Sequence, residues 1–229
     1  MKMHRLLATR ESTSFMAERI IALLFCLVTV GGCSSTRTIV VPVPPRVDLQ
    51  PYRILGIVDF SANADPTVSQ IATRQFQERV QDGQPGTRFV ELGAREKLLG
   101  VVGAAQFDAE AMRKIGAKYH VDAVFLGEIA YSDPKTDVRV GDPFRMQGAV
   151  STEMRGDLSA RLIETKSGAS VWSSSSWAKR QLGSARVSID HGISGRVTQS
   201  NPRHDMVPNL VYHVTTDFRP TSVRRRVEN

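Results

Sequence analysis

Residues 121–131 read VDAVFLGEIAY, and residues 157–178 read DLSARLIETKSGASVWSSSSWA. The first stretch is rich in branched apolar residues and is typical of a buried central strand. The second alternates apolar residues with small or polar ones on both sides of Lys166-Ser167-Gly168, which is typical of a β-hairpin. These two stretches predict three strands of one sheet, around which the rest of the domain is built.

The chain on either side of these strands predicts an alternation of strands and helices. Asp65-Pro66 is a helix start, because an N-cap precedes proline at the first helical position. The further predicted elements are strands at 53–60 and 88–92 and helices after Asp65, at 95–102, after Asp108 and at 207–218. The predicted order is β-α-β-α-β-β-β-α, an α/β domain with a mixed sheet over residues 52–220.

The front of the chain predicts an export signal over residues 1–32. An apolar run at 20–30 (IIALLFCLVTV) follows Arg19 and is too short to cross a bilayer as a helix. Gly31-Gly32-Cys33 then places two small residues before a cysteine, which resembles the lipobox of bacterial lipoproteins. The resemblance implies cleavage between Gly32 and Cys33, a diacylglycerol on the Cys33 thiol and an acyl chain such as palmitate on its amine. The alternative is an ordinary secretory signal that ends in cysteine.

The segments that flank the domain are predicted to be extensions. Residues 33–51 begin with the lipidated Cys33 and contain four prolines, so they predict an extended tether of polyproline II type. The residue after the cysteine is Ser34 and not aspartate. In lipoprotein sorting of the enterobacterial type, this favours the outer membrane. Residues 221–229 form a basic tail with Arg224, Arg225 and Arg226, in a chain whose formal charge is +7. This excess permits contact with anionic lipid headgroups or acidic polymers, but no motif predicts a nucleic-acid partner.

Catalytic and metal-binding patterns are weak. Ser132 and Lys135 fit S-x-x-K, and Lys166-Ser167-Gly168 fits K-[ST]-G, which together resemble motifs of penicillin-recognising serine enzymes. Ser132 follows a strand instead of opening a buried helix, and the two motifs lie too close together for that fold. The histidines of the mature chain show no metal-ligand spacing. We therefore predict no enzyme activity, no metal and no cofactor, and keep a serine hydrolase that uses Ser132 and Lys135 as an alternative.

A run of four serines, 173–176, lies between Trp172 and Trp177. On a strand, Val171, Ser173, Ser175 and Trp177 face one way, and the intervening residues face the other way. Small residues flanked by indoles form either a shallow binding face or a closely packed sheet, and we favour packing because aromatic residues on strands usually fill cores.

The strand at 53–60, the stretch 115–133 (IGAKYHVDAVFLGEIAYSD) and the hairpin at 157–177 resemble a domain shared by several lipoprotein groups. These are the CsgG-like curli-secretion channels, the LpoB-like activators of penicillin-binding proteins and the amino-terminal domain of the TolB family. The resemblance covers residues 52–180 and implies an anticodon-binding-like α/β sandwich that contacts proteins and needs no cofactor. Channel members carry two long amphipathic hairpins, whereas the matching segments here, 132–156 and 180–205, are short. The first is rich in charge, and the second alternates only weakly and offers no aromatic girdle. We therefore do not expect a pore.

These observations lead to one functional hypothesis and one main alternative. The hypothesis is a non-enzymatic outer-membrane lipoprotein, anchored by Cys33, whose periplasmic domain docks on a cell-envelope protein such as a peptidoglycan synthase. The alternative is a homo-oligomeric subunit of a secretion or assembly apparatus of the curli-channel type. The sequence does not locate the binding residues.

Overall fold

The computed structural model describes residues 36–140, 148–188, 192–197 and 201–228. Two compact units are distinguished, one containing residues up to Pro42 together with Ser222–Asn229, and one spanning Val43–Thr221. The predicted cleavage site and lipidated residue, Gly32 and Cys33, lie outside the described residues. No helix in the described part of the chain combines the length and apolarity needed to cross a membrane.

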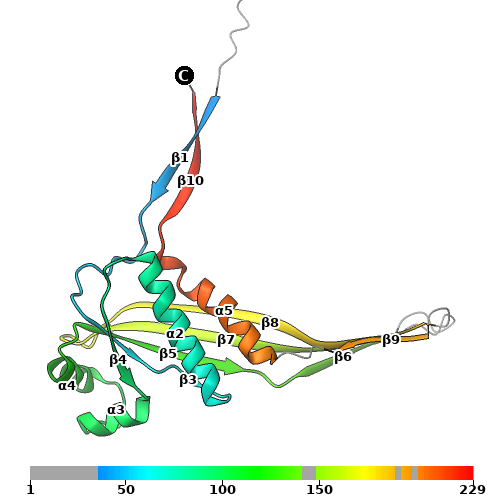
Figure 1. Cartoon of the computed structure of the whole chain (residues 1–229), viewed down its shortest axis with the longest axis horizontal. Helices are drawn as coiled ribbons and strands as arrows, with labels where there is room; N and C mark the ends of the chain where they lie inside the picture. Colours follow the sequence, from blue (N-terminus) through cyan, green and yellow to red (C-terminus); the bar gives the residue numbers. More distant parts are fainter. Residues whose placement is uncertain (1–35, 141–147, 189–191, 198–200, 229) are drawn as a thin grey trace, which may run out of the picture. The chain divides into compact units, whose positions relative to one another are not determined.

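The larger unit is built on a mixed sheet with the strand order β4-β2-β5-β7-β8-β9 (Figure 1). The strands on this path are β2 (Leu55–Val58), β4 (Phe89–Gly93), β5 (Ala123–Tyr131), β7 (Gly148–Glu164), β8 (Ser170–Ser188) and β9 (Gly192–Val197), and the short β3 (Ser61–Ala62) pairs with β5 off the path. β2 runs parallel to β4 and β5, and the later neighbours pair antiparallel. The predicted α/β class with a mixed sheet is confirmed, whereas the anticodon-binding-like sandwich stays a prediction.

The described part of the chain contains four α-helices, and two of them begin at the aspartate caps that the sequence predicts. They are α2 (Pro66–Gly83), α3 (Arg95–Val102), α4 (Ala109–Tyr119) and α5 (Pro202–Val214), with the 3-10 turn η2 (Thr216–Phe218) after α5. The Asp65 carboxylate accepts hydrogen bonds from the backbone N–H groups of Thr67 and Val68 at the start of α2. Asp108 caps α4 in the same way. These bonds satisfy N–H groups that would otherwise lack a partner, which explains why local sequence sufficed to predict both starts.

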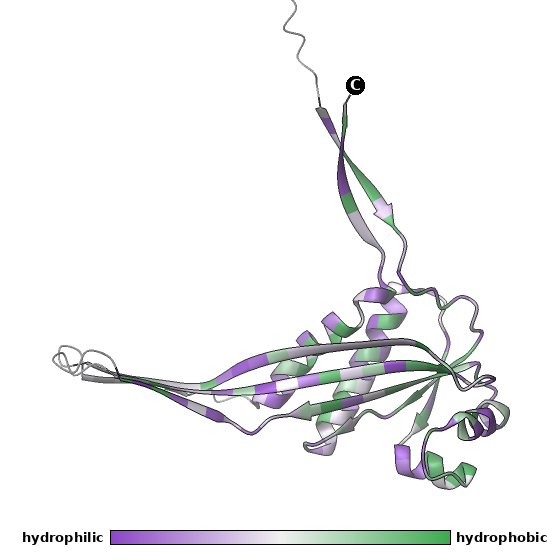
Figure 2. Ribbon diagram, turned by 180° about the vertical axis from the view of Figure 1, so that it is seen from behind, coloured by the Kyte–Doolittle hydropathy of each residue, from purple (hydrophilic) through white to green (hydrophobic). Residues whose placement is uncertain are grey.

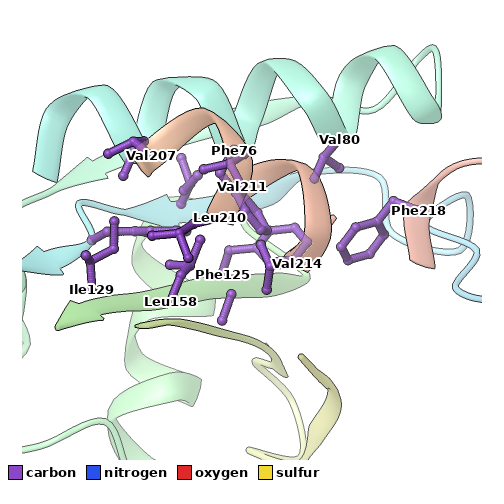
Figure 3. Packing of buried hydrophobic residues seen from close by; sticks show 14 of the residues in the cluster. Phe76, Val80, Phe125, Ile129, Leu158, Val207, Leu210, Val211, Val214 and Phe218 are labelled. Atoms are coloured by element: carbon purple, nitrogen blue, oxygen red, sulfur yellow. The ribbon is translucent and has the colours of Figure 1, made fainter. Parts of the chain in front are cut away.

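One face of the sheet packs against α2 and α5. The core between them contains an aromatic cluster of Phe76, Phe125, Trp172 and Phe218, whose ring centroids lie 4.5–6.4 Å apart. Aliphatic side chains of α5 complete this core, as Figure 3 shows for Val207, Leu210, Val211 and Val214. The closing helix predicted at 207–218 is thus confirmed, although it begins earlier and ends in η2.

The opposite face of the sheet is covered only in part. Helices α3 and α4 pack on Val124, Leu126 and Ile163, near the β2 and β4 side of the sheet. This second core includes Ile115 of α4 and Leu98 of α3. Figure 2, in which α2 and α5 lie behind the sheet, shows no helix over this face of β7 and β8.

The central hairpin is longer than the sequence indicated. We expected its strands over 157–164 and 169–178. The limits beside the turn are confirmed to within one residue, whereas the outer limits, 157 and 178, were wrong. β7 begins at Gly148, β8 continues to Ser188, and β6 (Lys135–Val140) and β9 pair along their outer parts. The segments 132–156 and 180–205, interpreted as short insertions, therefore supply much of a four-stranded ribbon. Because this ribbon buries little apolar surface, its residues lack the alternation by which the sheet core was found.

The segments predicted as tether and tail also differ from expectation. β1 (Thr36–Val43) and β10 (Thr221–Glu228) form a two-stranded sheet, so the first half of the tether is a paired strand instead of an isolated polyproline helix. Further along, Leu49 is buried, and its N–H donates to the side-chain oxygen of Gln84 at 2.7 Å. The predicted tether thus joins the fold before residue 52.

Candidate functional site

The uncovered face of β5, β7 and β8 is the candidate site. We name it the serine face, and it consists of Glu128, Arg155, Asp157, Ser159, Arg161, Ser173, Ser175 and Trp177. Seven of these residues are exposed, including Trp177 with 59% of its surface accessible, and Asp157 is partly exposed. These residues share a face because side chains alternate along each strand, and their neighbours Leu158, Ala160 and Ser176 are buried toward the helices.

The strand register arranges these residues in rows across the sheet. Glu128 pairs with Ser159, and Ser159 pairs with Ser175, so a carboxylate and two hydroxyls lie side by side. In the neighbouring row, Arg161 lies opposite Ser173. Directly opposite residues have Cβ atoms roughly 4.5–5.5 Å apart, which is close enough for one ligand group to contact two of them.

An aromatic and charged cluster lies at one end of the serine face. Asp157 pairs with Trp177 across the strands, and the Arg155 guanidinium lies 5.2 Å from the centroid of the Trp177 ring. The Nε of Arg155 donates to both carboxylate oxygens of Asp157 at 3.0 and 2.9 Å. These hydrogen bonds to the Asp157 carboxylate raise the pKa of Arg155. Arg155 therefore packs against the indole on the outside of the sheet.

At the other end, the start of α3 forms the wall of a groove of about 580 Å³. Arg95 provides this wall, and its guanidinium lies 5.1 Å from the Phe107 ring centroid. The floor is Ser159, Ser173 and Ser175 together with the backbone around Gly127. Serine is small, and its hydroxyl both donates and accepts hydrogen bonds, so such a floor admits a polar chain that lies against the sheet.

The two tryptophans of the serine run have opposite environments. Trp172 is buried in the aromatic cluster, and its indole N–H donates to Asp217 at 3.1 Å. Trp177 is exposed on the serine face. The predicted alternation is confirmed, and the preference for packing is right for Trp172 and wrong for Trp177. Sequence analysis did not single out Glu128 or Arg161 because only the strand register brings them beside the serines.

The serine-hydrolase alternative gains no support from the geometry. Ser132 follows β5, its N–H donates to the backbone oxygen of Arg155 at 2.9 Å, and its hydroxyl accepts from the N–H of Arg155 at 3.1 Å. Lys135 is exposed at the start of β6, where it pairs with Glu153. The Lys166-Ser167-Gly168 motif is the turn between β7 and β8, with Gly168 at φ 73°.

The histidines in the described part of the chain occupy separate places. His120 ends α4 in the left-handed conformation, His204 lies 3.4 Å from the Asp65 carboxylate, and His213 contacts the ring of Tyr212. His191 lies outside the described residues. Within the described ranges, no group of three or more histidine, cysteine, aspartate or glutamate side chains could hold a metal ion.

Comparisons with known proteins find fold-level likenesses only. No protein-family model matches the chain, and no curated protein matches it. Among solved structures, a PelC dodecamer from Paraburkholderia phytofirmans is 12% identical with a TM-score of 0.38, and the match covers 80% of this chain and 98% of that one. The LpoB C-terminal domain from Escherichia coli is 12% identical with a TM-score of 0.31, over 58% of this chain and 87% of that one.

Lipoprotein GNA1162 from Neisseria meningitidis is 14% identical with a TM-score of 0.35, and the match covers 56% of this chain and 83% of that one. Because these three TM-scores lie below 0.5, nothing about these proteins is transferred to this chain. The resemblance to CsgG-like and TolB amino-terminal domains stays a prediction from the sequence.

Proposed function

We propose that this chain is a non-enzymatic outer-membrane lipoprotein, held at the membrane through Cys33, whose periplasmic unit docks on a cell-envelope protein through the serine face. The observation that carries the proposal is the exposed Trp177, which the Arg155–Asp157 pair fixes beside uncovered serines. Tryptophan and arginine dominate the energetics of protein interfaces, and an exposed indole held in one place loses little conformational entropy on binding.

The composition of the face suits a protein partner. Glu128, Arg161 and Arg95 carry charges of both signs around the serine floor, so a partner with complementary charges would be held in one register. The serines between these charges are small and polar, which allows close approach of a backbone. A lipid anchor would raise the local concentration of the docking unit, so a modest affinity would suffice for function. A peptidoglycan synthase is the partner class we put forward first.

Site-specific photocrosslinking in cells tests this proposal. A photoreactive amino acid at Ser175 should give one discrete adduct with an envelope protein, and Trp177→Ala should reduce that adduct by roughly tenfold or more, as expected for an interface hot spot. Tyr212 on α5 is the matched control, because it is also exposed and its ring lies 4.0 Å from the Arg219 guanidinium. Tyr212→Ala should leave the adduct unchanged. Equal loss in both variants, or no adduct at Ser175, would contradict docking through the serine face.

A second candidate function is favoured by exposed valines on the ribbon. Val138 and Val150 pair with each other, and Val140 lies on the same face as Val138, with exposed fractions of 62%, 39% and 81%. Such a stripe suits contact with another copy of the chain in an oligomeric secretion or assembly apparatus. Light scattering of the detergent-extracted protein distinguishes the two functions. A monomer or dimer supports the docking module, and a discrete larger assembly supports the apparatus.

A further inference from the structure

The strand pair β1–β10 combines a concentration of positive charge with exposed apolar side chains. Arg37 of β1 and Arg224, Arg225 and Arg226 of β10 are all exposed, and the acidic residue of the two strands is Glu228. Exposed valines and isoleucine lie among these arginines, namely Ile39, Val40, Val223 and Val227. An isolated two-stranded sheet is only marginally stable in water, so a surface that covers these apolar side chains would stabilise the pair.

The chain brings this strand pair close to the proposed lipid anchor. Cys33 precedes Thr36, the first residue of β1, by three positions. Since an extended chain spans at most about 3.6 Å per residue, β1 starts within roughly 11 Å of the anchored residue. Figure 1 shows the two strands running in opposite directions, with the carboxyl end of β10 beside the start of β1. Arg226 lies two residues from that end.

Side chains alternate along a strand, so Val223, Arg225 and Val227 share one face of β10, and Arg224 and Arg226 share the other. We propose that β1–β10 lies on the membrane that carries the anchor, that Arg225 binds its anionic lipid headgroups, and that Arg224 and Arg226 add to the electrostatic attraction. The inference rests on the lipid anchor of the proposed function. The charge is complementary to phosphate headgroups, and at physiological salt the attraction acts over about 8 Å, so proximity to the anchor is required. Arginine side chains keep their heads in the headgroup layer, while neighbouring valines enter the acyl boundary.

This contact adds to an anchor that its several acyl chains already make stable, and it fixes where the chain leaves the membrane. Each basic residue near an anionic surface multiplies association by roughly fivefold. Arg225 on the side of the valines, with the charges of Arg224 and Arg226 close behind it, therefore suffices to hold a strand pair that is already confined to the surface by acyl chains.

Fluorescence quenching on vesicles tests the inference with the full acylated protein. The two cysteines of the sequence are Cys26 and Cys33, so a Val227→Cys variant of the processed, acylated chain carries one free thiol for a fluorophore. The protein is reconstituted in vesicles of phosphatidylcholine alone, or of phosphatidylcholine mixed with phosphatidylglycerol. Each vesicle type includes a headgroup spin-labelled lipid as quencher. The label should be quenched strongly only with phosphatidylglycerol, and high salt should reverse the quenching.

Charge variants provide the controls. Replacing Arg224, Arg225 and Arg226 by glutamine should lower the phosphatidylglycerol-dependent quenching by roughly tenfold or more. Replacing Arg113, Lys114 and Lys118 on α4 by glutamine removes the same charge from the other unit and should leave the quenching unchanged.

The inference would be overturned by equal quenching in both vesicle types or by quenching that does not change with salt. It would also be overturned by energy transfer between the labels of two protein molecules in the absence of lipid, which would show that a second copy covers the strands. Vesicle flotation reports the anchor separately. Protein that floats without phosphatidylglycerol-dependent quenching refutes this inference alone, whereas protein that does not float refutes the lipid anchor itself.

Discussion

Substituting Gly127 by alanine tests the packing on which the serine face depends. Gly127 lies in β5, and a Cβ built on it would be 2.5 Å from two carbons of the Phe60 ring, Cε2 and Cζ, and 2.6 Å from a third. Ordinary van der Waals contact begins at 3.4 Å, so the ring would have to move by about 1 Å. Phe60 is fully buried, and its ring lies 5.1 Å from that of Phe76. It therefore has little room to move.

Overpacking of this kind costs about 1–3 kcal/mol, and replacing glycine in a strand returns about 0.5–1 kcal/mol. We therefore expect Gly127→Ala to lower the free energy of unfolding by about 1–2 kcal/mol in guanidinium denaturation, with an unchanged m-value.

Gly100 is the matched control. It lies within α3, no atom would come within 4 Å of its added Cβ, and its φ is not positive. Gly100→Ala should stabilise the protein by about 0.5–1 kcal/mol through helix propensity. If Gly127→Ala proves as stable as wild type while Gly100→Ala stabilises, the close packing of Phe60 on β5 is wrong.

Four substitutions have separable effects on unfolding. Trp172→Ala should lower the free energy of unfolding by about 3–5 kcal/mol because it leaves a cavity in the aromatic cluster, whereas Trp177→Ala should lower it by less than about 1 kcal/mol. Equal losses in the two variants would contradict the opposite environments of the two tryptophans. Thr165→Val should cost about 1 kcal/mol because the buried Thr165 hydroxyl donates to a backbone oxygen at 2.8 Å, and an unchanged denaturation midpoint would refute that bond. Burial raises the pKa of Tyr131 to about 12 from an ordinary 10.0, so its stabilisation is complete below pH 10 and is lost as the pH rises toward 12. The denaturation midpoint of Tyr131→Phe should therefore fall less between pH 10 and pH 12 than that of the wild type. If the midpoints of the two proteins fall in parallel, this account of Tyr131 is wrong.

The sequence predicted those elements whose signals are local. Asp65 and Asp108 mark helix starts because a cap acts within three residues, and both starts are confirmed by hydrogen bonds. The central strands were predicted because buried strands carry branched apolar residues. Each of these signals can be read within a short window of the chain.

Pairing between distant segments left no such signal. β1 and β10 lie at opposite ends of the described chain, and neither reveals its partner by composition. The prolines indicated an extended backbone for the first of these segments, which is correct, but an extended chain can equally be a polyproline helix or a paired strand.

Only part of the candidate site could be predicted from the sequence. Alternation along 171–178 separated Trp177 from Trp172, and this separation is confirmed. The contribution of Glu128 and Arg161 depends on register, because shifting a strand by one residue would turn either side chain to the other face. No single strand contains that information.

The most direct test of the account is mass spectrometry of the N-terminal peptide of the protein isolated from bacterial membranes. We predict that the mature chain begins at Cys33 and that this peptide carries the mass of a diacylglycerol and a further acyl chain. Cys33→Ala should abolish both the modification and the retention of the protein in the membrane fraction. A mature chain that begins elsewhere, or an unmodified Cys33 in membrane-bound protein, would contradict a lipid-anchored docking module.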